Sequence, residues 1–349
     1  MLSETNKTLK NIFWILFFFF IVLVLYITHI MANFLVPIFL AFFVAMLFHP
    51  ILRKLSKTKI PLVISTIIVI LLSVLSVALV SFFIIISIQN FLKDISEVRD
   101  KVIKMTVSFI NIVSQNELLK EYINKESILS EIKIFFQELN YSTYMFSTVN
   151  KTFGWIKDLF IFLIALTFIV PTLNVTSSKI AAAFPKRKYT IKKLLLRINQ
   201  KIQNYIVVKS IISFVTGILT YIICIAFGVK HALLCGVLAF LLNYIPYIGS
   251  AIAVIIPGIF SILYNDSTIA VLFLVGLLIV MQQLLGSFLE PQFQSSVVGL
   301  SPIVILVSVM VWGFIWGIVG VILAVPIMSS FSLICENIDG LKPISKMLS

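Results

Sequence analysis

The chain has 349 residues, of which 60% are hydrophobic and only 12% are charged, and its formal net charge is +13. A mean hydropathy of +1.12 is too high for the surface of a water-soluble domain of this length. The composition therefore excludes a soluble protein and predicts an all-α integral membrane protein.

Stretches without a charged residue mark the expected membrane helices, because a bilayer core ~30 Å thick needs about 20 apolar residues per helix. These stretches are 11–52, 60–92, 159–178, 210–229, 232–265, 267–289 and 291–335. The first is too long for one helix, and we expect it to break near 29–33 into helices at about 12–29 and 34–50. The chain thus contains about eight hydrophobic helical blocks.

The first block follows Lys7 and Lys10, as in a secretory signal peptide. Its end, ITHIMANF, lacks a small-residue cleavage pattern, and apolar sequence resumes at once. We therefore expect a helix that is retained.

The distribution of charge predicts topology. Arg53, Lys54, Lys57 and Lys59 fill one short loop, and residues 179–201 contain eight basic residues and no acid. Short basic loops stay in the cytoplasm, so we expect both loops and both termini there, whereas the mixed-charge stretch 93–151 faces outward. The basic residues report orientation, and no nucleic-acid partner is expected.

Hydropathy and charge together divide the chain into five segments. These are N-terminal transmembrane helices at 1–92, an extracytoplasmic amphipathic segment at 93–151, a transmembrane helix followed by a basic cytoplasmic amphipathic helix at 152–204, a transport core at 205–335 and a cytoplasmic tail at 336–349.

Two polar segments have helical periodicity. In the outer segment, Ile132, Phe135, Phe136 and Leu139 recur at helical spacing, which indicates short amphipathic helices on the outer surface. In residues 189–206 an apolar stripe is flanked by basic residues that predict an anchor on the anionic surface of the bilayer. These residues are Lys192, Lys193, Arg197 and Lys201.

Residues for enzymatic chemistry do not form a known motif. Cys224, Cys235 and Cys335 lie within apolar helices without paired spacing, and the three histidines stand singly at the ends of blocks. HExxH, GxxxxGK[ST] and GxSxG are all missing from the sequence. We expect no catalytic residue, no metal and no cofactor.

Two of the hydrophobic blocks, 232–265 and 291–335, are longer than one span and are interrupted by proline and glycine. Proline removes a backbone donor, and freed backbone groups are costly in lipid unless protein or water satisfies them. Each block is therefore expected to break or re-enter the membrane, as in transporters whose broken helices line a cavity. The predicted path or hinge residues in these blocks are Asn243, Pro246, Gly249, Pro257, Pro291, Gly299, Pro302, Gly313, Gly317, Gly320 and Pro326.

Glu290 is the carboxylate between the apolar stretches 267–289 and 291–335. Ionisable residues at membrane depth mark transport paths, and a carboxyl there can bind a proton on one side and release it on the other. A helix-end carboxylate at the water interface remains an equal alternative. Gln282 and Gln283 are candidates for contact with a polar solute or with another helix, and Lys209 is expected to extend to the interface.

Several motifs in order, NYIVVKSIISFVTG, GVLAFLLNYIPYIGS, LEPQ, VGLSP and WGIVGVILAVPI, are similar to those of the autoinducer-2 exporter family of bacterial membrane proteins. The similarity covers about 200–335, and 1–190 match only in hydropathy. It implies a multi-pass inner-membrane exporter of small molecules, in a family whose members are assigned to autoinducer-2 export and to sodium/proton antiport. It also implies a homo-oligomer, for which a pentamer is one option.

Three function classes fit a membrane chain. A secondary transporter accounts for the interrupted blocks and the lone acid, with a proton-driven exporter of an autoinducer-2-like molecule first and a sodium/proton antiporter as the alternative. A channel needs a polar pore over several helices, which are too apolar here. A scaffold protein leaves the proline-glycine segments unexplained. The sequence favours the transporter.

Overall fold

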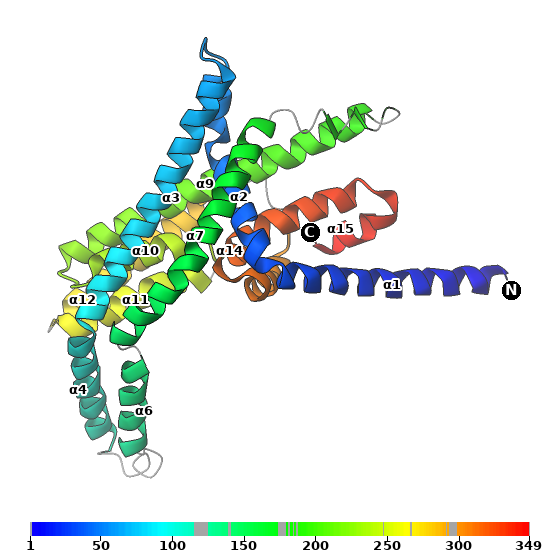
Figure 1. Ribbon diagram of the computed structural model, residues 1–349. Helices are drawn as coiled ribbons and strands as arrows, with labels where there is room; N and C mark the ends of the chain where they lie inside the picture. The colour runs from blue at the N-terminus through cyan, green and yellow to red at the C-terminus, as the bar shows by residue number, and fades with distance from the viewer. Residues whose placement is uncertain are drawn as a thin grey trace. The chain divides into compact units, whose positions relative to one another are not determined.

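The structure is a computed structural model that describes residues 2–114, 125–138, 141–173, 179–180, 182–183, 185, 188–246, 248–265, 267–290, 292 and 299–348. Within these residues the regular structure is entirely helical, as the composition predicts (Figure 1). The main elements are α1 (Leu2–Ile30), α2 (Ala32–Leu55), α3 (Leu62–Lys93), α4 (Ile95–Val113), α6 (Lys125–Glu138), α7 (Tyr141–Thr172), α9 (Lys188–Ala226), α10 (Ala232–Leu242), α11 (Ile248–Tyr264), α12 (Thr268–Gln282), η2 (Gln283–Leu289), α14 (Pro302–Glu336), η3 (Asp339–Leu341) and α15 (Lys342–Leu348).

Five helical stretches in the described part of the chain are long and apolar enough to cross a bilayer. They are Ala32–Leu55, Val63–Lys93, Lys188–Ala226, Thr268–Leu289 and Pro302–Glu336, and three shorter apolar helices accompany them at Phe18–Ile30, Ala232–Leu242 and Ile248–Tyr264. The expected break in the first hydrophobic block is confirmed, because α1 ends at Ile30 and α2 begins at Ala32.

The chain forms two compact units, each discontinuous in sequence. Unit 1 contains residues 1–73, 157–207 and 296–349, and unit 2 contains residues 74–156 and 208–295. Helix α9 begins in unit 1 and ends in unit 2, so the basic stretch at its start and the apolar span that follows form one continuous helix. The five segments drawn from hydropathy remain a prediction.

The first overlong block folds as a hairpin of α10 and α11 within unit 2, which we call the first hairpin. Helix α10 has 11 residues and so rises only about 16 Å, which is too short for a bilayer core of ~30 Å. The residue after the hairpin lies close to the segment before it, because Nδ2 of Asn265 donates a hydrogen bond to the carbonyl oxygen of Phe227 at 3.1 Å. The prediction of a broken or re-entrant segment is confirmed.

The second overlong block reverses direction inside α14, and we call its two arms the second hairpin. Gly317 lies at the reversal with φ 62° and ψ −143°, a conformation that only glycine adopts readily. The arms lie against one another in unit 1, since the hydroxyl of Ser308 donates to the carbonyl oxygen of Ala324 at 3.2 Å. Proline at position 302 starts the first arm, where a missing N–H costs nothing.

Apolar side chains on one face of α12 hold unit 2 together. Leu274, Leu278, Met281 and Leu285 recur every three or four residues and are buried, and they form one core with residues of α9, α10 and α11. The opposite face carries Leu272 and Phe273, which are 66% and 68% exposed. A helix that buries one apolar face in protein and exposes another is expected where the exposed face meets lipid.

The amphipathic segments form helices as predicted. Helices α4 and α6 lie side by side in unit 2 (Figure 1). Ile134 and Phe135 are exposed, and Ile132 and Phe136 are half-buried, whereas Leu139 lies outside the described residues.

Candidate functional site

The best-defined polar feature of unit 2 is an ion pair between α9 and the end of η2. Nζ of Lys209 lies 2.6 Å from Oε1 of Glu290, and their side chains are only 5% and 17% exposed. Lys209 precedes the end of α9 at Ala226 by 17 positions in the chain, or about 25 Å of helix. The expectation that Lys209 extends to the interface is therefore wrong, because its ammonium group is buried against a carboxylate.

A π-helical segment leads into Glu290. Residues Gln283–Leu289 form η2, which continues directly from α12. Such segments are rare and occur often at functional sites, because the wider turn shifts the side chains that follow. Here the segment sets the direction from which Glu290 reaches Lys209. Pro291, predicted as part of the same site, lies outside the described residues.

The two glutamines before Glu290 differ in their surroundings. Gln282 is 7% exposed, and its Nε2 atom has no hydrogen-bond partner in the described part of the chain. Gln283 is exposed, and its Oε1 accepts a hydrogen bond from the Ser287 hydroxyl at 2.7 Å. A buried amide donor without a partner is costly, so Gln282 is the better candidate of the two for contact with a solute or water.

The tip of the first hairpin contacts α9 beside Lys209. Nδ2 of Asn243 donates to the Ser213 hydroxyl at 3.0 Å, and the Tyr244 hydroxyl donates to the Ser210 hydroxyl at 2.9 Å. Sequence reasoning selected Asn243 but missed Ser210, Ser213 and Tyr244. The available signal was the presence of Ser210 and Ser213 next to an isolated lysine. Their hydrogen-bond partners, however, are 34 and 30 residues away in the chain.

Gly249, Pro246 and Pro257 shape the first hairpin. Pro246 lies in the turn between α10 and α11, and Pro257 is buried inside α11. A Cβ atom on Gly249 would overlap the carbonyl oxygen of Leu242, so the start of α11 lies directly against the end of α10. Gly249 is therefore required by the close approach of two backbone segments.

The remaining predicted hinge residues all belong to the second hairpin or its approach in unit 1. A Cβ atom on Gly320 would overlap the carbonyl oxygen of Trp312, and one on Gly313 would lie 2.9 Å from Cγ2 of Val321. Pro326 is buried, whereas Gly299 and Pro302 are exposed at the start of the first arm. These residues build a tightly packed helical hairpin, and their part in a transport path stays a prediction.

The tip of the second hairpin is fixed by an aromatic contact in unit 1. Nε1 of Trp316 donates to the carbonyl oxygen of Thr28 at 3.1 Å, and its ring centroid lies 4.6 Å from that of Phe39. The reversal at Gly317 is thus held against the turn between α1 and α2.

The four predicted membrane anchors lie on the first turns of α9. Lys192, Lys193 and Arg197 are exposed, and Lys201 is half-buried. Ile198, on the apolar stripe of the same segment, is buried in the protein. Anchoring on the bilayer surface by the basic residues stays a prediction.

A second charged cluster joins α4 to the base of the first hairpin in unit 2. Nζ of Lys230 lies 2.5 Å from Oε2 of Glu97 and 3.1 Å from Oδ2 of Asp94. The hydrogen bond from Lys230 lowers the pKa of Glu97, and the same bond raises the pKa of Lys230. Exposed charges of this kind are expected where a helix leaves the bilayer, here at the C-terminal end of α9.

No group of three His, Cys, Asp or Glu residues that could hold a metal ion occurs among the residues described. The site around Lys209 and Glu290, at the tip of the first hairpin, contains one ammonium group, one carboxylate, hydroxyls and amides. It is suited to bind a small polar solute or a proton.

Comparison with known sequences decides the family. A family model described as AI-2E family transporter matches residues 14–340, which is nearly the whole chain. The chain belongs to the AI-2E transporter family. The similarity noted in the C-terminal motifs is thereby confirmed, and it extends through the N-terminal half. Together with the apolar helices, membership makes this a multi-pass membrane protein of a transporter family.

Individual AI-2E relatives are similar over most of their length. The AI-2 transport protein TqsA of Escherichia coli K12 is 25% identical over 321 residues, which is 91% of this chain and 90% of the relative. A protein of Borreliella burgdorferi is 30% identical over 245 residues, 67% of this chain and 66% of the relative. One from Haemophilus influenzae is 27% identical over 313 residues, 88% and 87% of the two chains. The last two are provisionally named as transport proteins.

Proposed function

We propose that the chain is a secondary transporter of the bacterial inner membrane that exports a small polar molecule, similar to autoinducer-2, at the expense of the proton gradient. The observation that carries this proposal is the buried ion pair of Lys209 and Glu290 beside the tip of the first hairpin. A buried pair costs several kcal/mol per ion in desolvation, and apolar residues in its place are often as stable. A charge pair retained at membrane depth is therefore a functional candidate.

The pair supplies a simple coupling step. In the conformation described, Nζ of Lys209 and Oε1 of Glu290 are in contact. A proton that binds Glu290 cancels the charge that holds the ammonium of Lys209, so the pair opens. Ser210 follows Lys209 on α9 and accepts the hydrogen bond of Tyr244. Opening of the pair thereby changes the contact between α9 and the hairpin tip.

The Nε2 donor of Gln282, which has no partner among the described residues, and the hydroxyls of Ser210 and Ser213 suit a solute with several hydroxyl groups. The name of the E. coli relative, AI-2 transport protein TqsA, supports autoinducer-2 as the first solute to test. Sodium/proton antiport is the alternative within the family, and it would use the same carboxylate without an organic solute. We also propose that the protein is a homo-oligomer and that both of its termini lie in the cytoplasm.

The test is transport by the purified protein in liposomes. Autoinducer-2 flux is measured with a pH gradient, with a sodium gradient and with neither, while an enclosed pH dye reports proton movement. Solute flux that requires the pH gradient supports the proposal. Proton movement driven by sodium without solute supports the antiporter, and solute flux independent of both gradients overturns proton coupling.

A further inference from the structure

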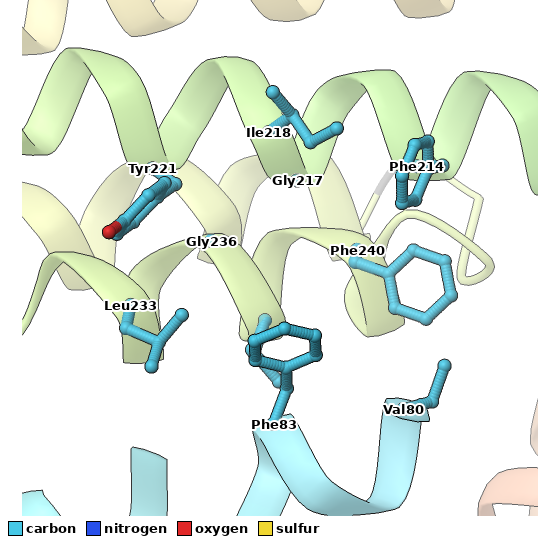
Figure 2. A pocket seen from close by; sticks show the side chains of 10 residues that line it. Val80, Phe83, Phe214, Gly217, Ile218, Tyr221, Leu233, Gly236 and Phe240 are labelled. Atoms are coloured by element: carbon cyan, nitrogen blue, oxygen red, sulfur yellow. The ribbon is translucent and has the colours of Figure 1, made fainter. Parts of the chain in front are cut away.

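An apolar pocket lies between α3, α9 and α10 in unit 2. Near its end α3 joins the core, because the Phe91 ring centroid lies 5.9 Å from that of Phe260. About two turns earlier, Val80 and Phe83 face a space of about 320 Å³ (Figure 2). Its other walls come from α9 and α10, with the residues Phe214, Gly217, Ile218, Tyr221, Leu233, Gly236, Val237 and Phe240.

Two glycines make the surface concave. A Cβ atom on Gly217 would lie 2.9 Å from the carbonyl oxygen of Gly236, and one on Gly236 would lie 2.8 Å from that of Gly217. The backbones of α9 and α10 are thus in contact where the helices cross, and no side chain fills the surface at that point. In Figure 2 the rings of Phe214, Phe240 and Phe83 stand around this crossing.

The lining excludes water and polar solutes. Among the lining side chains only Tyr221 has a polar atom. A buried water needs two to four polar partners, and apolar cavities without them stay dry. An unfilled space of this size would forfeit the dispersion contacts of all its walls. Within a bilayer, the apolar groups available to fill it are acyl chains.

The depth of the pocket fits an acyl chain. The ionised cluster around Lys230 marks the interface at the C-terminal end of α9. Tyr221 and Phe214 precede that end at Ala226 by about 8 and 18 Å of helix. One leaflet of hydrocarbon is about 15 Å thick. The pocket therefore opens at the level of the chains of that leaflet.

We propose that this pocket is a lipid site, occupied by one acyl chain of a phospholipid of the leaflet at the C-terminal end of α9. A helix of a second protein copy, about 10 Å across, is too wide for this volume. The inference does not depend on the proposed transport cycle.

The lipid site lies next to the residues that hold the tip of the first hairpin against α9. The Phe240 ring, which lines the pocket, meets the Tyr244 ring edge to face at 5.8 Å and 89°. The Tyr244 hydroxyl donates to Ser210. An acyl chain that contacts Phe240 thus packs next to Tyr244, the residue that links the hairpin tip to α9.

The full-length protein in detergent is titrated with a phospholipid that carries a photoreactive diazirine in its acyl chain, and adducts are mapped by mass spectrometry. Labelling of Phe83 and Phe240 is expected to saturate as the concentration of photoreactive lipid rises. Labelling of the exposed α12 face around Leu272 is expected to rise in proportion, because that face meets exchanging lipid.

A filled-pocket variant provides the matched comparison. Val237→Trp occupies the space and is expected to lose most of the labelling at Phe83, whereas Leu272→Trp introduces the same residue outside the pocket and keeps the labelling. Both variants are checked for an unchanged elution volume in detergent. Labelling of Phe83 that does not saturate, or that survives Val237→Trp, overturns the proposal. Displacement by free palmitate but not by unlabelled phospholipid also overturns it, because the source would then be a free fatty acid.

Discussion

Lys209 and Glu290 are 81 positions apart in the chain, yet Nζ and Oε1 lie 2.6 Å apart in the interior of unit 2. Neither charge is at the surface, so each depends on the other for its stability. The contact joins the middle of α9 to the end of the π-helical segment, and it lies next to the residue that receives the tip of the first hairpin.

Removing one member of this pair is expected to destabilise the protein more than removing both. Lys209→Met removes the ammonium group that lies against the carboxylate of Glu290 and should cost about 3–5 kcal/mol, whereas Lys209→Met with Glu290→Gln should recover most of that loss. Thermal unfolding in detergent measures the wild type, Lys209→Met, Glu290→Gln and the double variant. A loss in the double variant equal to the sum of the two single losses would show that the two charges do not depend on each other.

Glu290→Gln is expected to flatten the pH dependence of transport by the fraction of the protein that folds. The amide keeps the shape of the side chain but cannot bind and release a proton. Transport in liposomes at several external pH values measures the effect, and Glu336→Gln, at the exposed end of α14, is the matched control. A wild-type pH profile in Glu290→Gln would make Glu290 a structural residue.

Glycine is expected to be essential at two of the helical close approaches. Gly249→Ala and Gly320→Ala each place a Cβ atom on a backbone carbonyl, so both should abolish transport and lower the unfolding temperature. Gly276, inside α12, has open space around its Cα. Gly276→Ala should therefore change stability by less than about 1 kcal/mol. Normal transport by Gly249→Ala and Gly320→Ala would show that glycine is not required at these two close approaches.

The contact between α4 and the first hairpin is expected to depend on pH. The Lys230 hydrogen bond lowers the pKa of Glu97 from its ordinary 4.5, so its stabilising effect is present above that value and is lost as pH falls through the lowered pKa. The pKa of Lys230 is raised from 10.5, so its contribution is present below that value and is lost at more alkaline pH.

Spin labels at Ser108 on α4 and Ile262 on α11, both exposed, measure this contact. The distance distribution should be narrow at neutral pH and broad in acid below the lowered pKa of Glu97. Lys230→Gln should be broad throughout, and Lys104→Gln, on the exposed side of α4, should resemble the wild type. A distribution that stays narrow in Lys230→Gln would show that other contacts hold α4.

The orientation in the membrane is expected to place the basic loops inside. On a background without Cys224, Cys235 and Cys335, Lys57→Cys should react with an impermeant thiol reagent only after the cells are opened. Ser108→Cys should react from outside in intact cells. Strong external labelling at position 57 would reverse the topology.

The sequence by itself determined the class of protein and where its helices break. Sixty per cent hydrophobic residues require a bilayer, and proline and glycine within overlong apolar blocks require interruptions, because these are local properties of the chain. The interruptions appear between Leu242 and Ile248 and at Gly317, inside the predicted blocks.

Only the tertiary structure decided that both blocks fold back as hairpins and that Lys209 meets Glu290. A broken helix can continue across the membrane or return, and the choice depends on contacts such as Asn265 with Phe227 and Ser308 with Ala324. Lys209 at the edge of an apolar run has the pattern of a residue that extends to the interface. Its burial depends on a partner brought close by the packing of α12 and η2 against α9, which no local pattern contains.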